Sequence, residues 1–252
     1  MSGAVRMKAL ILAAGYGTRL YSLVKDTPKA LLEIKAKPLV NYILEKVAAL
    51  PDLDEVILVT NNKFYAAFQD WAERQTAYPH PIHVINDGTN TPEDRLGSIG
   101  DIDFVLKKRT VDDDMLVIGS DNLFDYDLDA YIGFALKKVP SVTIGLYDLG
   151  DREEARKFGV VVLDAQGRVI SFEEKPAQPT STLVAMCLYF FPRKSLGFIA
   201  DYLAESGTSD AAGDYIWWLH KRKNVYGFQF TGKWYDIGSV ETYKQAQEKF
   251  PS

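Results

Sequence analysis

The sequence predicts an α/β protein with a doubly wound, mostly parallel sheet and a mixed C-terminal part. Short apolar runs alternate with helix-length amphipathic segments through about the first 150 residues. Continuous apolar runs of this kind are typical of parallel strands that helices cover on both faces. In the remaining residues, polar and apolar side chains alternate along the first runs, which indicates strands with one exposed face.

Five strands are expected in the first part, at residues 8–14, 55–60, 82–85, 115–120 and 141–147. Between them, helices with apolar faces are expected at 40–50, 63–75 and 96–108. This order is Rossmann-like, and in such folds ligands bind beyond the carboxyl ends of the strands. We therefore expect the segments 15–17, 86–88 and 120–122 to lie near one crevice.

The second part is expected to begin with a hairpin at 158–176, because two alternating runs flank a turn from Asp164 to Gly167. The further elements expected are a strand at 182–191, helices at 193–205 and 212–223, strands at 225–230 and 233–238, and a closing helix from Ser239. Nothing marks a linker. We therefore predict a single domain over residues 1–252, made of a part of about 1–150 and a part of about 151–252.

The composition narrows the class of protein. The net charge of −5 argues against a nucleic-acid binder, which needs a basic surface. No apolar run approaches the ~20 residues that span a bilayer. The single cysteine, Cys187, excludes an internal disulfide or a cysteine zinc cluster and lies in an apolar strand, where we expect a buried, unreactive thiol. We expect a cytoplasmic protein.

A glycine-rich turn follows the first strand, at Gly15 to Gly17. Bare backbone in such a turn lets N–H groups approach phosphate oxygens. Leu20 stands where the dinucleotide fingerprint needs a glycine, and the turn lacks the Gly-Lys-Ser/Thr of a P-loop. The segment 15–37 holds five cations and two acids, which suggests a small anionic ligand, although charge alone indicates a solvated basic surface equally well; the cations are Arg19, Lys25, Lys29, Lys35 and Lys37.

Four motifs stand in order along the chain: LAAGYGTRL with TPKALLEI, then GSDNLF, then FGVV through FEEKP, then WYDIG. Together they resemble the signature of the sugar nucleotidyltransferases, the nucleoside-diphosphate-sugar pyrophosphorylases, and especially the short glucose-1-phosphate thymidylyltransferases. The second motif is similar to that family's G-D-N loop with Ser120 inserted. The resemblance extends over most of the chain and implies the nucleotide-diphospho-sugar transferase type of α/β fold.

The resemblance implies that an NTP and a sugar 1-phosphate react to give an NDP-sugar and pyrophosphate, with Mg²⁺ as cofactor. Both reactants are anions, so the expected catalysis is charge neutralisation with in-line positioning. The implied catalytic residues are Arg19 and Lys29, and the implied metal ligands are Asp121 and Asp236. The implied nucleotide-binding residues are Leu12, Ala13, Ala14, Gly15, Gly17, Thr18, Asn86, Gly97, Ser98 and Asp121. The implied acceptor-binding residues are Asn122 and, in the C-terminal part, Gly159, Glu174 and Lys175.

The resemblance does not determine which nucleobase or which acceptor substrate the protein binds. The family's base-reading glutamine is absent, although Asn86 and the backbone around Gly97 are candidates for contact with a pyrimidine. A CTP-dependent cytidylyltransferase for phosphocholine or another phosphoalcohol is the alternative, because late aromatic residues are candidates for an ammonium cage; they are Tyr215, Trp217, Trp218, Trp234 and Tyr235. A non-catalytic nucleotide-sugar sensor is a third hypothesis, although it would be expected to lose a catalytic residue. No nucleic-acid or membrane partner is expected, and a homo-oligomer is compatible with the resemblance.

Overall fold

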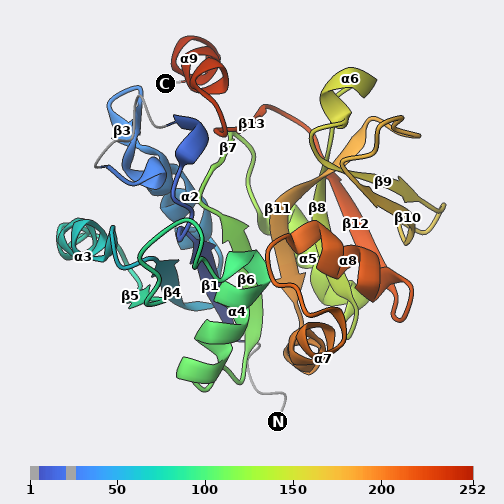
Figure 1. Cartoon of the computed structure of the whole chain (residues 1–252), viewed down its shortest axis with the longest axis horizontal. Helices are drawn as coiled ribbons and strands as arrows, with labels where there is room; N and C mark the ends of the chain where they lie inside the picture. Colours follow the sequence, from blue (N-terminus) through green and yellow to red (C-terminus); the bar gives the residue numbers. More distant parts are fainter. Residues whose placement is uncertain (1–5, 21–26, 252) are drawn as a thin grey trace.

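The structure is a computed structural model that describes residues 6–20 and 27–251, except for the side chain of Arg19. Nine of its strands form one sheet (Figure 1). They are β1 (Met7–Leu12), β4 (Leu53–Thr60), β5 (Ile82–Asn86), β6 (Asp114–Gly119), β8 (Val142–Asp148), β9 (Gly159–Leu163), β10 (Val169–Glu174), β11 (Leu183–Phe191) and β12 (Val225–Phe230). The strand order is β10-β9-β11-β6-β1-β4-β5, and β8 pairs with both β11 and β12.

The central strands are parallel, as predicted. β1 lies between β4 and β6, and β4 pairs with β5, all in parallel register. The strand predicted at residues 141–147 forms as β8, which runs in the same direction as β6 but does not pair with it. The antiparallel strand β11 separates β6 from β8, because it pairs through Leu188 with Ile118 on one edge and through Tyr189 with Ile144 on the other. Strands from both halves of the chain therefore share one sheet.

Helices cover both faces of the sheet, which confirms the doubly wound class. One face packs against α2 (Leu39–Ala48), α3 (Tyr65–Glu73) and α5 (Asp129–Lys138). The other packs against α4 (Gly97–Lys108), α7 (Gly197–Ser206) and α8 (Ala212–His220), which lie in front of the sheet in Figure 1. Successive residues of β1 alternate between the two cores, with Ile11 in one and Leu10 in the other. The helix α5 was not predicted.

Smaller elements complete the chain. They are the strands β2 (Glu33–Ile34), β3 (Lys37–Pro38), β7 (Asn122–Phe124) and β13 (Trp234–Asp236), the helices α6 (Arg152–Ala155) and α9 (Val240–Lys249), and the 3₁₀ turns η1 (Thr18–Leu20), η2 (Lys29–Leu31) and η3 (Arg193–Ser195). The antiparallel pair of β7 and β13 is clamped to α2 and α9 by a third apolar cluster that contains Leu123, Ile237 and Phe250. A capping box at Ser239 begins α9. This pair of strands positions the candidate site.

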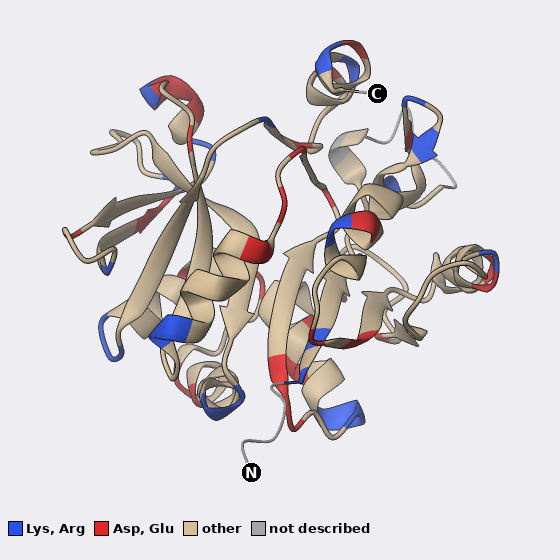
Figure 2. Ribbon diagram, turned by 180° about the vertical axis from the view of Figure 1, so that it is seen from behind, with Lys and Arg blue, Asp and Glu red and all other residues tan. Residues whose placement is uncertain are grey.

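The helices of residues 6–20 and 27–251 include none that is long and apolar enough to cross a membrane. Lysines and arginines are distributed over several outer elements and are interspersed with acids (Figure 2).

Candidate functional site

Lys29, Asp121 and Asp236 come together from three distant segments. The Lys29 Nζ atom lies 2.7 Å from Asp121 Oδ2, and the two side chains are 17% and 31% exposed. Asp236 pairs with Asn122 in the register of β13 and β7, and the N–H of the following residue, Ile237, donates to the Asp121 carbonyl at 2.9 Å. The two predicted metal ligands are thus neighbours on an antiparallel strand pair, with a cation beside one of them.

The charges at this cluster favour an ionised Asp121. Burial tends to raise the pKa of Asp121, but the Lys29 ammonium outweighs that effect and holds the pKa below its ordinary value. Cys187 borders the same carboxylates. Burial, followed by the negative charges of Asp121 and Asp236, raises the pKa of the Cys187 thiol to about 12. The thiol is therefore protonated at neutral pH, as expected for an unreactive cysteine, although the residue is half-buried and not fully buried as predicted.

The loop that holds Asp121 is fixed by buried hydrogen bonds. The Asn122 side chain is 2% exposed, accepts from the Trp234 indole at 2.7 Å, and donates to the Gly119 carbonyl at 3.0 Å. A Cβ on Gly119 would lie 2.9 Å from Asp121 Oδ1, so glycine is required for this close approach. The structure supports a positioning role for Asn122, and its predicted contact with the acceptor stays a prediction.

Buried side chains hold the backbone just before the glycine turn, and the turn leaves space beside Gly15. The Thr60 hydroxyl donates to the Ala13 carbonyl at 3.2 Å, and the Asn61 amide donates to the Ala14 carbonyl at 2.9 Å, both from fully buried positions. A Cβ built on Gly15 would meet no atom of the described residues within 4 Å, and Gly17 has a φ of 63°. Sequence reasoning missed Thr60 and Asn61, although their place at the end of a central strand was a usable signal.

Two other predicted nucleotide-binding residues, Leu12 and Thr18, flank the glycine turn. The Leu12 carbonyl accepts the Ser120 N–H at 3.0 Å, which ties the turn to the Asp121 loop. Thr18 is exposed at the start of η1. The side chain of Arg19 and the whole of Lys25 lie outside the described residues, so their phosphate contacts stay predictions.

The predicted base-contact residues are already engaged within the chain. Asn86 accepts the Gly88 N–H and donates to Asn62 Oδ1, each at 2.8 Å. The Ser98 N–H donates to the Asp210 carbonyl at 3.0 Å. Gly97 has a φ of 78°, and a Cβ there would lie 2.4 Å from Asp210 Cα. The loop before α8 thus covers the start of α4, and the predicted contacts of Asn86, Gly97 and Ser98 with a base stay predictions.

Glu174 and Lys175 lie at the end of β10, beside the first turn of α8. Burial raises the pKa of Glu174, and the Lys175 ammonium, 3.6 Å from it, opposes that shift. A Cβ on Gly213 would lie 2.0 Å from Glu174 Oε2, and one on Gly159 would lie 3.1 Å from the same atom. Two glycines therefore make room for this carboxylate, while the side chain of Lys175 is 65% exposed.

The strand β11 lies between this region and the aspartate cluster. Its residue Val184 pairs with Val160, which follows Gly159, and a Cβ on Gly119 would lie 2.9 Å from Cys187 Cβ. Burial, then Cys187 and then Glu174, raises the pKa of Tyr189 in the same strand.

The cations of residues 15–37 do not all lie at the candidate site. Lys29 lies in the site. Lys37, in the β2–β3 hairpin, instead pairs with Glu45 of α2 at 2.7 Å. The backbone N–H of Lys35, in the same hairpin, donates to Gln247 of α9 at 3.0 Å. Figure 2 shows the lysines of this hairpin at the edge of the molecule. Only part of the cluster therefore faces the candidate site.

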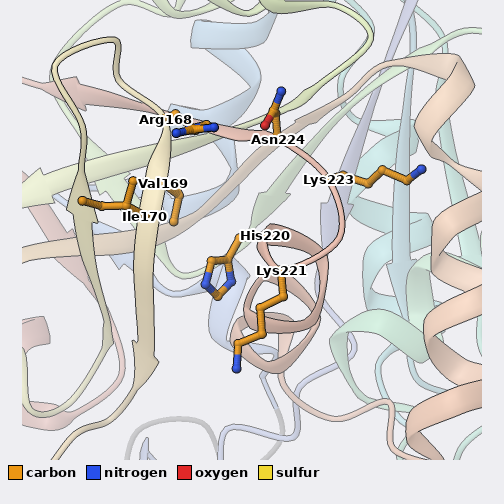
Figure 3. A pocket seen from close by; sticks show the side chains of 7 residues that line it. All are labelled: Arg168, Val169, Ile170, His220, Lys221, Lys223 and Asn224. Carbon is orange, nitrogen blue, oxygen red and sulfur yellow. The ribbon is translucent and has the colours of Figure 1, made fainter.

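A pocket of about 420 Å³ lies elsewhere, between the start of β10 and the end of α8. Its charged lining residues are Arg168, Lys221 and Lys223, whose side chains extend in different directions (Figure 3). The Arg168 guanidinium is held by Asp164 at 3.1 Å. Because these cations do not converge, we assign no ligand to this pocket.

Comparisons with known proteins place the chain in a family. The family model for nucleotidyl transferases matches residues 8–252. The chain is 30% identical over 242 residues to the bifunctional protein GlmU of Methanocaldococcus jannaschii, a match that covers 92% of the chain and 51% of that relative. It therefore spans about half the length of the curated relatives it matches.

Solved structures share the fold. UDP-glucose pyrophosphorylase complexed with UDP-glucose superposes with a TM-score of 0.82 at 22% identity, covering 98% of each chain. The apo form of UDP-glucose pyrophosphorylase gives a TM-score of 0.79 at 22% identity, also covering 98% of each chain. These likenesses confirm the predicted fold class. Since the family model covers nearly the whole sequence, the chain belongs to the nucleotidyl transferase family.

Proposed function

We propose that the chain is a magnesium-dependent nucleotidyltransferase that joins a pyrimidine NTP to a sugar 1-phosphate in the cytoplasm. The single observation that best supports this is the cluster of Lys29, Asp121 and Asp236 at the carboxyl end of the central strands. An ion pair of 2.7 Å beside a second carboxylate, next to an open glycine turn, suits a polyphosphate better than a neutral ligand.

In the proposed reaction, an acceptor phosphate oxygen attacks the α-phosphorus of the NTP. The new P–O bond forms as the bond to the bridging oxygen of pyrophosphate breaks, and pyrophosphate takes the electron pair. Because both reactants are negative, the rate depends on fixed positive charge and positioning. Lys29 is held in place by Asp121 before any substrate binds, so its charge is preorganised for the α-phosphate region.

The residues fit a magnesium ion. Mg²⁺ is a hard cation that takes one or two carboxylates and completes its shell with phosphate oxygens and water. Asp121 and Asp236 offer carboxylate oxygens on one strand pair, and the lowered pKa of Asp121 keeps it ionised. When bound there, Mg²⁺ supplies Lewis-acid neutralisation of phosphate charge.

The proposed acceptor site is the end of β10. Lys175 is exposed enough to reach a phosphate, and the Glu174 carboxylate is fixed between two glycines, where it can accept hydrogen bonds from sugar hydroxyls. Asp210, in the loop before α8, accepts hydrogen bonds from the Arg95 guanidinium at 3.0 and 2.8 Å.

The phosphocholine alternative is disfavoured by burial. Of the late aromatic residues, Tyr215, Trp218 and Trp234 are at most 9% exposed and pack in the cores. Trp217 is 45% exposed, but the Lys221 ammonium lies 3.6 Å over its ring. A cation already covers the face that a quaternary ammonium would need. The sensor hypothesis is disfavoured because Lys29 and both aspartates are present and assembled.

The decisive test is pyrophosphate release with Mg²⁺, measured for CTP, UTP, dTTP, ATP and GTP against several sugar 1-phosphates and phosphocholine. We expect turnover only with a sugar 1-phosphate and a pyrimidine nucleotide. Turnover with phosphocholine alone would select the cytidylyltransferase instead. Nucleotide binding without turnover in every combination would favour the sensor.

Asp121→Asn and Asp236→Asn test the roles of the carboxylates. Each is expected to lower turnover by at least ~10²-fold, as loss of preorganised charge does. The fold should survive, because the apolar cluster that holds β7 and β13 is untouched. The matched control is Asp70→Asn on the exposed face of α3, which should keep wild-type turnover. Wild-type activity in both site variants would refute the metal assignment.

A further inference from the structure

A line of hydrogen bonds joins the glycine turn to the end of β5. The Tyr16 hydroxyl donates to Thr89 Oγ1 at 3.1 Å. The Thr89 hydroxyl and its backbone N–H then donate to Asp87 Oδ1, at 2.8 and 2.7 Å. Thr89 and Asp87 are 5% and 6% exposed, so their hydrogen bonds are buried, while Tyr16 is half-buried.

Asp87 in turn meets a second buried acid, Asp101 on α4, which is also 6% exposed. With both groups written as carboxylates, Asp87 Oδ2 and Asp101 Oδ1 are buried without a donor. A buried pair of this kind holds one proton, because two adjacent carboxylates cannot both be ionised at low cost. A single proton shared between Asp87 and Asp101 satisfies both atoms.

The surroundings of the pair favour the protonated form. Burial and then the charge and hydrogen bond of Asp87 raise the pKa of Asp101 to about 8. Among the described residues, Asp87 is the charged group that shifts Asp101. At the other end, burial raises the pKa of the Tyr16 hydroxyl, and Asp94, Asp87 and Asp101 add to this shift. Tyr16 therefore stays protonated and can donate.

The connected residues belong to three segments of the proposed nucleotide site. Tyr16 lies between Gly15 and Gly17, and Asp87 directly follows Asn86. Asp101 lies four residues after the start of α4, on the same face of the helix as its first residue. The shared proton thus completes a hydrogen-bonded connection from the glycine turn, through Thr89 and Asp87, to Asp101 on α4.

We propose that Asp87 and Asp101 are positioning residues for nucleotide binding, whose shared proton holds the glycine turn and α4 in the arrangement that binds an NTP. This inference rests on the proposed function. Loss of the proton leaves two buried carboxylates side by side, which repel and release the Thr89 and Tyr16 connection. Nucleotide affinity should therefore fall on the alkaline side while the chemical step is unchanged.

The test is equilibrium binding of the tightest of CTP, UTP, dTTP, ATP and GTP with Mg²⁺, by calorimetry, between about pH 6.5 and about pH 9. If only the protonated pair binds, the wild-type Kd rises about tenfold from about pH 7 to about pH 9. Asp101→Asn keeps a neutral hydrogen-bond donor toward Asp87, so the Kd of this variant should match that of wild type at pH 7. As the pH rises to about 9, the Kd of the variant should lack the tenfold rise expected for wild type. Comparison at each pH removes the titration of the nucleotide itself.

Two further variants keep the inference testable if one protein does not fold. Asp87→Asn also removes the second acid and should flatten the profile, whereas Asp70→Asn should retain the wild-type profile. In turnover assays, the pH effect should appear in KM for the NTP and be absent from kcat. Parallel profiles of wild type and both pair variants would overturn this inference alone. Absence of any NTP binding would overturn the proposed function and this inference with it.

Discussion

The substitution Asp101→Asn should change how the stability of the protein depends on pH. In the folded chain, the pKa of Asp101 is raised from 3.8 to about 8, first by burial and then by Asp87. Between these values the folded state holds a proton that the unfolded state has released. Stability therefore falls as pH rises through this window, and the loss is complete once the folded group has also titrated. Asparagine cannot titrate, so the variant lacks this loss.

The magnitude follows from the proton count. One proton of difference gives a slope of about −1.4 kcal/mol of unfolding free energy per pH unit. From about pH 5 to about pH 7, wild type should thus lose about 3 kcal/mol relative to Asp101→Asn. The side chain is only 6% exposed, so solvent screening reduces this effect little.

The assay is urea denaturation of both proteins at several pH values, with the difference in unfolding free energy plotted against pH. Asp70→Asn serves as the control, because that carboxylate is exposed on α3 and should give a flat difference. A difference between wild type and Asp101→Asn that varies by less than about 0.5 kcal/mol over this range would refute the shared proton.

Two other substitutions test the packing around the site. Trp234→Phe should destabilise the protein by about 1–3 kcal/mol in urea denaturation, because the buried Asn122 oxygen loses its 2.7 Å donor; an unchanged midpoint would contradict this. Gly97→Ala should cost more than about 1 kcal/mol, because its Cβ would lie 2.4 Å from Asp210 Cα at a positive φ, whereas Gly133→Ala in α5, with nothing within 4 Å, should be tolerated.

The sequence predicted most of the fold because its strands are strong local signals. The runs that became β1, β4, β5 and β6 each hold consecutive apolar residues and include Val or Ile, so their identity as strands needs no partner information. The helix α5 was missed because its apolar positions Tyr131, Ile132 and Ala135 are interrupted by Gly133. The place of β11 between β6 and β8 depends on pairing between residues far apart, which local patterns do not contain.

The candidate site was predictable in part for the same reason. The resemblance indicated Lys29, Asp121 and Asp236, and the structure brings these three together. It did not indicate the buried groups behind them, such as Asn61 under the glycine turn, because a polar residue after a strand looks like any turn residue. The inserted Ser120 is accommodated because its N–H extends the pairing with β1 by one residue.

The two acid clusters differ in what compensates their charge, and this separates their expected effects on activity. Asp121 lies beside the Lys29 ammonium, which lowers the pKa of this carboxyl, so Asp121 is ionised at neutral pH. Asp101 is balanced by a proton, which is lost near pH 8. The Asp121 carboxylate proposed to hold Mg²⁺ therefore keeps its charge at a pH where the pair of Asp87 and Asp101 loses its proton. An alkaline decline of kcat/KM should accordingly arise from nucleotide binding, through loss of the proton shared by Asp87 and Asp101.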